Sequence, residues 1–87
     1  MSVPYRGALD VPRELVIFLS RLLAAERRRR GTRRGRRALT PFRQAVLVLR
    51  WLRDAAGIDR LAADAGISPA TAYRYVHEGI DVLADAA

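Results

Sequence analysis

The sequence predicts an all-α protein, a small helical bundle of about four helices. Apolar residues recur at helical spacing in four segments, and residues that favour helix starts and ends separate these segments. The chain has 87 residues, of which 51% are hydrophobic, so we expect one domain with a thin core. We expect a flexible tail at residues 1–9 and a single helical domain at residues 10–87. Within this domain, residues 10–30 form an N-terminal helix, residues 31–38 an arginine-rich connector, and residues 39–87 the remaining helices.

Charge is unevenly distributed along the chain. All sixteen basic residues are arginines. Fourteen arginines against three acids leave residues 1–53 at +11, whereas two arginines against six acids leave residues 54–87 at −4. Attraction to an anionic partner must therefore come from the first half of the chain.

The composition excludes several kinds of site. The chain has no cysteine and a single histidine, His77, so neither a disulfide framework nor a metal site rich in Cys or His can form. The nine acidic residues fall at expected helix caps and on helix surfaces, without a nucleophile–base pair. We therefore predict no catalytic residue, no metal and no cofactor. No stretch is long and apolar enough to span a membrane, and the lack of cysteine fits an intracellular location.

The first expected helix is amphipathic with a wide apolar face. Asp10 can cap a helix that begins near Val11-Pro12. Ile17 falls on the opposite side from the apolar face. Packing within the domain accounts for that face. The alternative is that part of it, together with Ile17, meets a missing domain or another subunit, and a subunit contact would give a homodimer through the Leu15–Leu23 helix. The apolar face consists of Leu15, Val16, Phe18, Leu19, Leu22, Leu23 and Ala25.

An arginine-rich run follows this helix. Eight of the twelve residues from 26 to 37 are arginine, and Gly31 and Gly35 predict a flexible arm. Such an arm can neutralise DNA phosphates, and Arg34-Gly35-Arg36 resembles the core of minor-groove hooks. The alternatives are a solvated linker and a general attraction to RNA or acidic lipid. The expected phosphate contacts are Arg27, Arg28, Arg29, Arg30, Arg33, Arg34, Arg36, Arg37 and Arg43.

The next helix is expected to pack between neighbours. Thr40 suits its N-cap, Pro41 its first turn and Gly57 its stop. Two apolar faces predict a central strut, with the Leu15 helix on one side and the last two helices on the other. Trp51 is expected in the core or at a subunit contact. One face holds Phe42, Ala45, Val46, Leu49, Leu52 and Ala56, and the other holds Leu47, Val48, Trp51 and Ala55.

Residues 59–77 have the spacing of a helix, a tight turn and a second helix. Asp59 and Ser68 can each accept a hydrogen bond at a helix start, and Pro69 suits a first helical position. Gly66 suits the left-handed residue that ends a helix. This spacing is typical of a helix-turn-helix, whose second helix lies in the DNA major groove.

The last helix is expected from Pro69 to about Asp85. Its inner face holds Ala72, Tyr75, Val76, Gly79, Val82 and Leu83. We expect Glu78, Asp81 and Asp85 on the outer side, where their carboxylates would repel phosphate. In an alternative interpretation, Arg74 and Tyr73 contact only DNA phosphates and no base. The expected base contacts are Ser68, Ala70, Thr71, Tyr73, Arg74 and His77.

Residues 39–87 resemble the N-terminal helix-turn-helix of insertion-sequence transposases with a DDE-type nuclease domain, the harbinger-like group. The matching features include Leu39-Thr40-Pro41, Gly66-Ile67-Ser68 and Thr71–Val76, which reads TAYRYV. The resemblance implies sequence-specific binding to double-stranded DNA at terminal inverted repeats. The chain stops at Ala87, where the nuclease domain of that family would begin. We therefore expect a recognition fragment or remnant without catalytic activity, associated with the bacterial nucleoid.

Two other functions fit the same residues. The Leu-Thr-Pro start and the Gly-Ile-Ser turn also occur in small transcription regulators and in sigma-factor-like promoter-binding proteins. A protein-interaction module is the alternative from another class, with the apolar Leu15 face binding a partner. A free-standing enzyme is the least favoured function, because no catalytic constellation is found.

Overall fold

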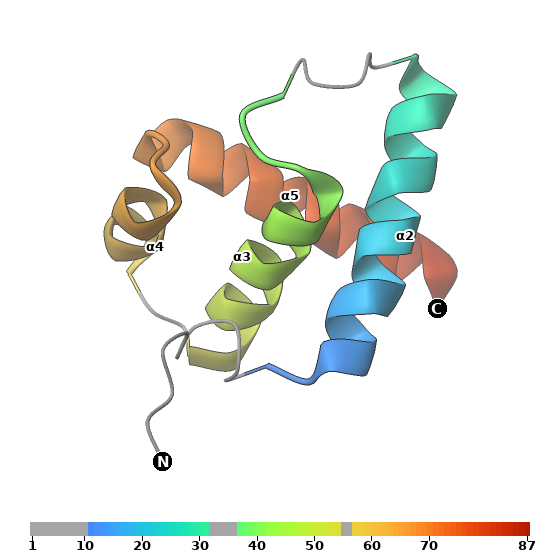
Figure 1. Ribbon diagram of the computed structural model, residues 1–87, viewed down its shortest axis with the longest axis horizontal. Helices are drawn as coiled ribbons and strands as arrows, with labels where there is room; N and C mark the ends of the chain where they lie inside the picture. The colour runs from blue at the N-terminus through green and yellow to red at the C-terminus, as the bar shows by residue number, and fades with distance from the viewer. Residues whose placement is uncertain (1–10, 32–36, 55–56) are drawn as a thin grey trace.

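The computed structural model describes residues 11–31, 37–54 and 57–87 (Figure 1). These ranges hold four α-helices and no strand, so the predicted all-α bundle is confirmed. The predicted tail at residues 1–9 lies outside the described residues. The helices are α2 (Arg13–Arg30), α3 (Pro41–Asp54), α4 (Ile58–Ala65) and α5 (Pro69–Ala86).

Helix α2 begins after Pro12, which occupies the N-cap position without a side-chain cap. Asp10, the residue expected to cap this helix, lies outside the described residues. The helix ends at Gly31, whose φ of 76° is the left-handed conformation that glycine adopts readily. Four arginines occupy the last turn, where positive charge is favourable against the helix dipole.

Three residues near the starts of α3 and α4 have predicted roles at helix ends, namely Thr40, Gly57 and Asp59. The Arg43 N–H donates to the Thr40 hydroxyl over 3.2 Å, which confirms the cap of α3. Gly57 does not end α3 in a left-handed conformation. It has φ of −58° and is the N-cap residue of α4. Asp59 is not the cap either, because α4 begins one residue earlier, at Ile58, and places Asp59 inside its first turn.

The turn between α4 and α5 follows the predicted pattern. Gly66 has φ of 72°, and the N–H groups of Gly66 and Ile67 donate to the carbonyls of Ala63 and Ala62. This pair of bonds is the Schellman ending of a helix. The Thr71 N–H donates to the Ser68 hydroxyl over 3.1 Å, so Ser68 caps α5 and Pro69 is its first residue. A tight turn thus joins the two helices.

Two apolar clusters form the core. The first joins α2 to α3 and to the second half of α5, and the second joins α3 to α4 and to the first half of α5 (Figure 1). Helix α3 therefore packs between α2 and the last two helices, as predicted, and α5 contacts all three other helices. The buried members of the first cluster are Val11, Val16, Leu19, Leu23, Ala45, Val48 and Val82. Those of the second are Leu39, Leu47, Leu61, Ala62, Ala72, Tyr75 and Val76.

Part of each predicted apolar face is exposed. On α2, Leu15 and Phe18 are both 49% exposed. On α3, Phe42 is 47% and Leu52 is 48% exposed. The apolar faces predicted for α2 and α3 therefore extend beyond the surfaces that the neighbouring helices bury.

Gly79 sets the approach of α5 to α3. It is buried on the inner face of α5, and a β-carbon at this position would lie 2.5 Å from Cγ2 of Val48. The absence of a side chain thus permits the close packing expected at this residue. This contact fixes the depth at which α5 lies on the bundle.

Candidate nucleic-acid interface

The first half of α5 presents the face predicted for base contacts. Ala70, Tyr73, Arg74 and His77 are exposed there, and Thr71 is half-buried. Ser68 is exposed at the tip of the helix. The inner face is buried as predicted, so packing directs these polar side chains away from the core.

Contacts within α5 orient several of these side chains. The rings of Tyr73 and His77 meet edge to face, with centroids 4.4 Å apart and planes at 65°. The Ser68 hydroxyl donates to Oγ1 of Thr71 over 2.9 Å while it caps the helix. Ser68 therefore uses both its donor and one acceptor site locally, and the Thr71 hydroxyl keeps its proton to offer.

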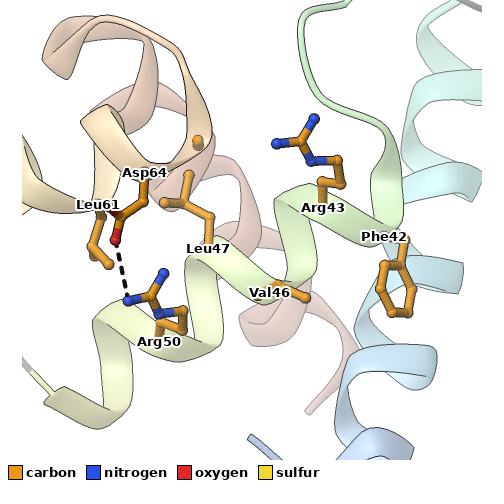
Figure 2. A pocket seen from close by; sticks show the side chains of 8 residues that line it. Phe42, Arg43, Val46, Leu47, Arg50, Leu61 and Asp64 are labelled. Carbon is orange, nitrogen blue, oxygen red and sulfur yellow. Dashed lines mark hydrogen bonds and ion pairs between the residues drawn. The ribbon is translucent and has the colours of Figure 1, made fainter. Parts of the chain in front are cut away.

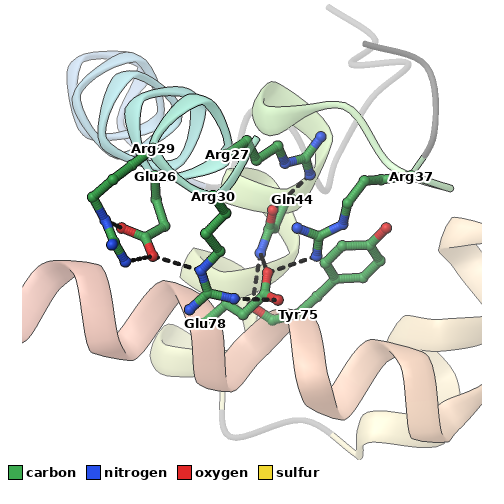
Figure 3. Close-up of polar contacts among 8 residues, drawn as sticks. All are labelled: Glu26, Arg27, Arg29, Arg30, Arg37, Gln44, Tyr75 and Glu78. Carbon is green, nitrogen blue, oxygen red and sulfur yellow. Dashed lines mark hydrogen bonds and ion pairs between the residues drawn. The ribbon is translucent and has the colours of Figure 1, made fainter. Parts of the chain in front are cut away.

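The structure separates the predicted phosphate contacts into distinct groups. Arg28 and Arg43 are exposed. Arg29 and Arg30 both donate to Glu26, with shortest distances of 2.6 Å (Figure 3). Hydrogen bonds from Arg29 first, and then from Arg30, lower the pKa of Glu26 to about 2. Three further predicted contacts, Arg33, Arg34 and Arg36, lie outside the described residues.

Gln44 is the centre of a buried polar network (Figure 3). Its side chain is fully buried, and its Oε1 accepts from Nη2 of Arg27 over 2.7 Å. Its Nε2 donates to the Tyr75 carbonyl and to Oε1 of Glu78, each over 3.1 Å. Burial first, and then repulsion by Arg37, lowers the pKa of Arg27. Arg27 is thus half-buried and bonded to Gln44, whereas Arg28 is exposed to solvent.

Glu78 does not lie on the outer side of α5, contrary to prediction. Its Oε1 accepts from Nη2 of Arg37 over 2.6 Å, and its Oε2 lies 3.9 Å from Nη1 of Arg30 (Figure 3). Arg30 and Arg37 lie far from Glu78 in the sequence, so the helical periodicity of α5 alone could not predict these contacts. The expected repulsion of phosphate is replaced here by an internal ion pair.

Tyr75 connects α5 to the residues after the arginine run. Its hydroxyl accepts from the buried N–H of Leu39 over 3.1 Å. The Arg37 guanidinium lies over its ring, 4.7 Å from the centroid, which is a cation–π geometry. Burial would lower the pKa of Arg37, but hydrogen bonds to Glu78 and Tyr75 outweigh it, so this pKa is raised. The segment around Arg37 and Leu39 is therefore fixed on α5.

Tyr75→Phe is expected to lower the free energy of unfolding by about 1–2 kcal/mol, because the Leu39 N–H then stays buried without an acceptor. Urea unfolding followed by circular dichroism measures the loss. Tyr73→Phe is the matched control, since that side chain is 53% exposed and its change should stay within about 0.5 kcal/mol. Equal effects of the two substitutions would contradict a role for the Tyr75 hydroxyl.

An apolar hollow of about 240 Å³ lies between α3 and α4 (Figure 2). Phe42, Val46, Leu47, Leu61 and Ala65 give it an apolar lining. At its edge, Nη2 of Arg50 lies 3.5 Å from Oδ2 of Asp64. This volume is below that of most small-molecule sites, and we assign no ligand to it.

Residues 11–31, 37–54 and 57–87 contain no group of three or more acidic or histidine side chains placed to hold a metal ion. Within the same ranges, no helix combines the length and apolar character needed to cross a membrane.

The site is thus an exposed polar face on the second of two helices joined by a tight turn, with Arg37 beside it. Comparison of the chain with protein-family models, curated proteins and solved structures found no match. The functional assignment therefore depends on the residues and their geometry.

Proposed function

We propose that this chain binds double-stranded DNA, with α5 in the major groove, as a binding domain without catalytic activity. The observation that carries the proposal is the exposed face of α5, where Thr71, Tyr73, Arg74 and His77 follow a capped, tight turn. Major-groove readers use these positions of the second helix to reach base edges. Arginine and hydroxyl side chains are suited to that task.

Arginines outside α5 would supply most of the affinity. Arg28 and Arg43 are exposed, and the chain carries a net charge of +7. Each phosphate that such a side chain neutralises releases counterions, which favours binding at low salt. The acidic second half of the chain would then contribute specificity more than attraction.

The DNA would be the terminal inverted repeat of a transposable element, and the chain would act at the nucleoid. The support for this finer proposal is the resemblance of residues 39–87 to transposase helix-turn-helix domains. A transcription regulator would use the same face of α5 at a promoter. Exposure of Leu15 and Phe18 on α2 favours the other alternative, contact with a protein or a second copy of the chain.

A selection from random duplex DNA, at about physiological ionic strength, tests the proposal. Non-specific contacts are weak there, at roughly 10⁻⁴ to 10⁻⁶ M, so a sequence reader should enrich a defined motif. That motif can then be sought at element ends and at promoters. Binding without a motif would refute sequence reading, and no binding would leave the interaction of α2 with a protein as the better function.

Arg74→Ala is expected to relax the preference at one base pair of the selected motif. A bidentate contact with guanine is worth about 1–3 kcal/mol of discrimination, and alanine cannot make it. Affinities for the motif and for its single-base variants measure the change. Arg13→Ala removes the same charge from an exposed position in α2 and should leave base preference intact. If Arg74→Ala weakens binding to all DNA sequences equally, Arg74 contacts a phosphate instead of a base.

A further inference from the structure

A polar hollow lies beside the exposed face of α5, where the residues after the arginine run meet this helix. It has a volume of about 250 Å³ and is lined by Arg37, Thr71, Arg74, Tyr75 and Glu78. Two guanidinium groups and a hydroxyl thus border one space, with Arg74 and Thr71 on the α5 side. This combination suits a small oxyanion such as a phosphodiester.

The negative charge of Glu78 does not prevent an anion from binding in this hollow. Its Oε1 accepts from Arg37 and Gln44, and its Oε2 lies 3.9 Å from Nη1 of Arg30. One carboxylate is therefore balanced by two arginines, and Arg74 adds a further positive charge. Arg37 is also repelled by Arg27, and an anion would relieve that repulsion.

The geometry of Arg37 is fixed before any ligand arrives. Its Nη2 is 2.6 Å from Glu78, its guanidinium lies over the Tyr75 ring, and its side chain remains 21% exposed. A guanidinium carries five N–H donors, which is more than Glu78 can accept. The remaining donors can bind an anion without the entropic cost of ordering a long side chain.

We propose that this hollow receives one backbone phosphate of the bound duplex, with Arg37 as donor and Glu78 as the residue that positions Arg37. The proposal rests on the proposed DNA binding and deepens it. A contact from Arg37 would set the register of α5 on the duplex, because Tyr75 and Glu78 tie this arginine to α5 itself.

The test compares two substitutions on α5 that each remove one negative charge. Glu78→Ala removes the carboxylate that positions Arg37, and Asp81→Ala removes an exposed carboxylate from the next turn. General electrostatics predicts that both variants bind a short fluorescent duplex more tightly. We expect this of Asp81→Ala, whereas Glu78→Ala should bind about two- to tenfold more weakly, because Arg37 must then be ordered on binding. Fluorescence anisotropy at fixed ionic strength measures both affinities.

The same pair of substitutions in an Arg37→Ala background tests whether the weaker binding of Glu78→Ala depends on Arg37. No arginine remains to be positioned there, so Glu78→Ala should now tighten binding, as Asp81→Ala does. Should Glu78→Ala lose helical circular dichroism, Glu78→Met and Asp81→Met give the same comparison, because methionine fills more of the space and offers Arg37 no oxygen acceptor. Tighter binding by the Glu78 variant in both backgrounds would overturn the phosphate site but leave DNA binding intact. Failure of the unsubstituted chain to bind any duplex would instead overturn the proposed function, and this inference with it.

Discussion

Gly79→Ala is expected to lower the free energy of unfolding by about 1–3 kcal/mol, although alanine is the better helix former by about 1 kcal/mol. The new β-carbon would lie 2.5 Å from Cγ2, 2.9 Å from Cγ1 and 3.1 Å from Cβ of Val48. The two valine methyl carbons lie closer than 3.0 Å, so Val48 or the two helices must shift to admit the new β-carbon. Urea unfolding of the purified protein measures the loss.

The control places the same substitution in a Val48→Ala background. Without the valine methyl groups, most of the clash is gone, and the helix preference of alanine should make Gly79→Ala neutral or stabilising. A double-mutant cycle then gives a large coupling between the two positions. Equal destabilisation in both backgrounds would show that the contact with Val48 is not the cause.

Gln44→Leu is expected to lower the free energy of unfolding by about 1–3 kcal/mol. Leucine fills a similar volume, so the cost arises from lost hydrogen bonds and not from a cavity. The substitution leaves the half-buried Arg27 guanidinium without its acceptor, and a group left unpaired in this way costs about 1–3 kcal/mol. The Tyr75 carbonyl loses the bond from Nε2 of Gln44 but keeps its hydrogen bond within α5. The urea midpoint, at an unchanged slope, measures the effect.

Removing the partner of Gln44 as well provides the control. Arg27→Met with Gln44→Leu replaces both sides of the 2.7 Å hydrogen bond by apolar groups. This double variant should be more stable than Gln44→Leu alone, because no half-buried cation is left without its acceptor. A double variant less stable than the single one would mean that Arg27 contributes mainly through its packing.

Features encoded by neighbouring residues were predictable from the sequence. The Thr40 cap, the left-handed Gly66 and the Ser68-Pro69 start each depend on a few adjacent residues, and the structure confirms all three. The buried face of α5 followed from helical periodicity in the same way. Gly57 and Asp59 were exceptions, because their roles depended on whether α4 begins at Ile58 or at Arg60, and the neighbouring residues alone do not decide that.

Features that depend on distant residues were not predictable. Glu78 meets Arg37 across 41 residues of sequence and Gln44 across 34. Periodicity placed Glu78 with the outer carboxylates, and nothing local distinguished it from Asp81. The arginine run likewise gave no sign that Arg27 is half-buried while Arg28 is exposed. The signal available in the sequence was Gln44, a polar residue one helical turn before Val48 on a predicted apolar face.

The two apolar clusters give the four helices unequal resistance to local unfolding. Helices α3 and α5 contribute buried residues to both clusters, whereas α2 belongs only to the first and α4 only to the second. The eight residues of α4 can therefore open while α5 stays attached to α2 and α3. We expect the amide protons of α4 to exchange through such local openings. The amide protons of Val48 and Gly79, where α3 packs on α5, should exchange only when the whole chain unfolds. The helix proposed to read DNA thus belongs to the most persistent part of the fold, and the helix that precedes it in the sequence does not.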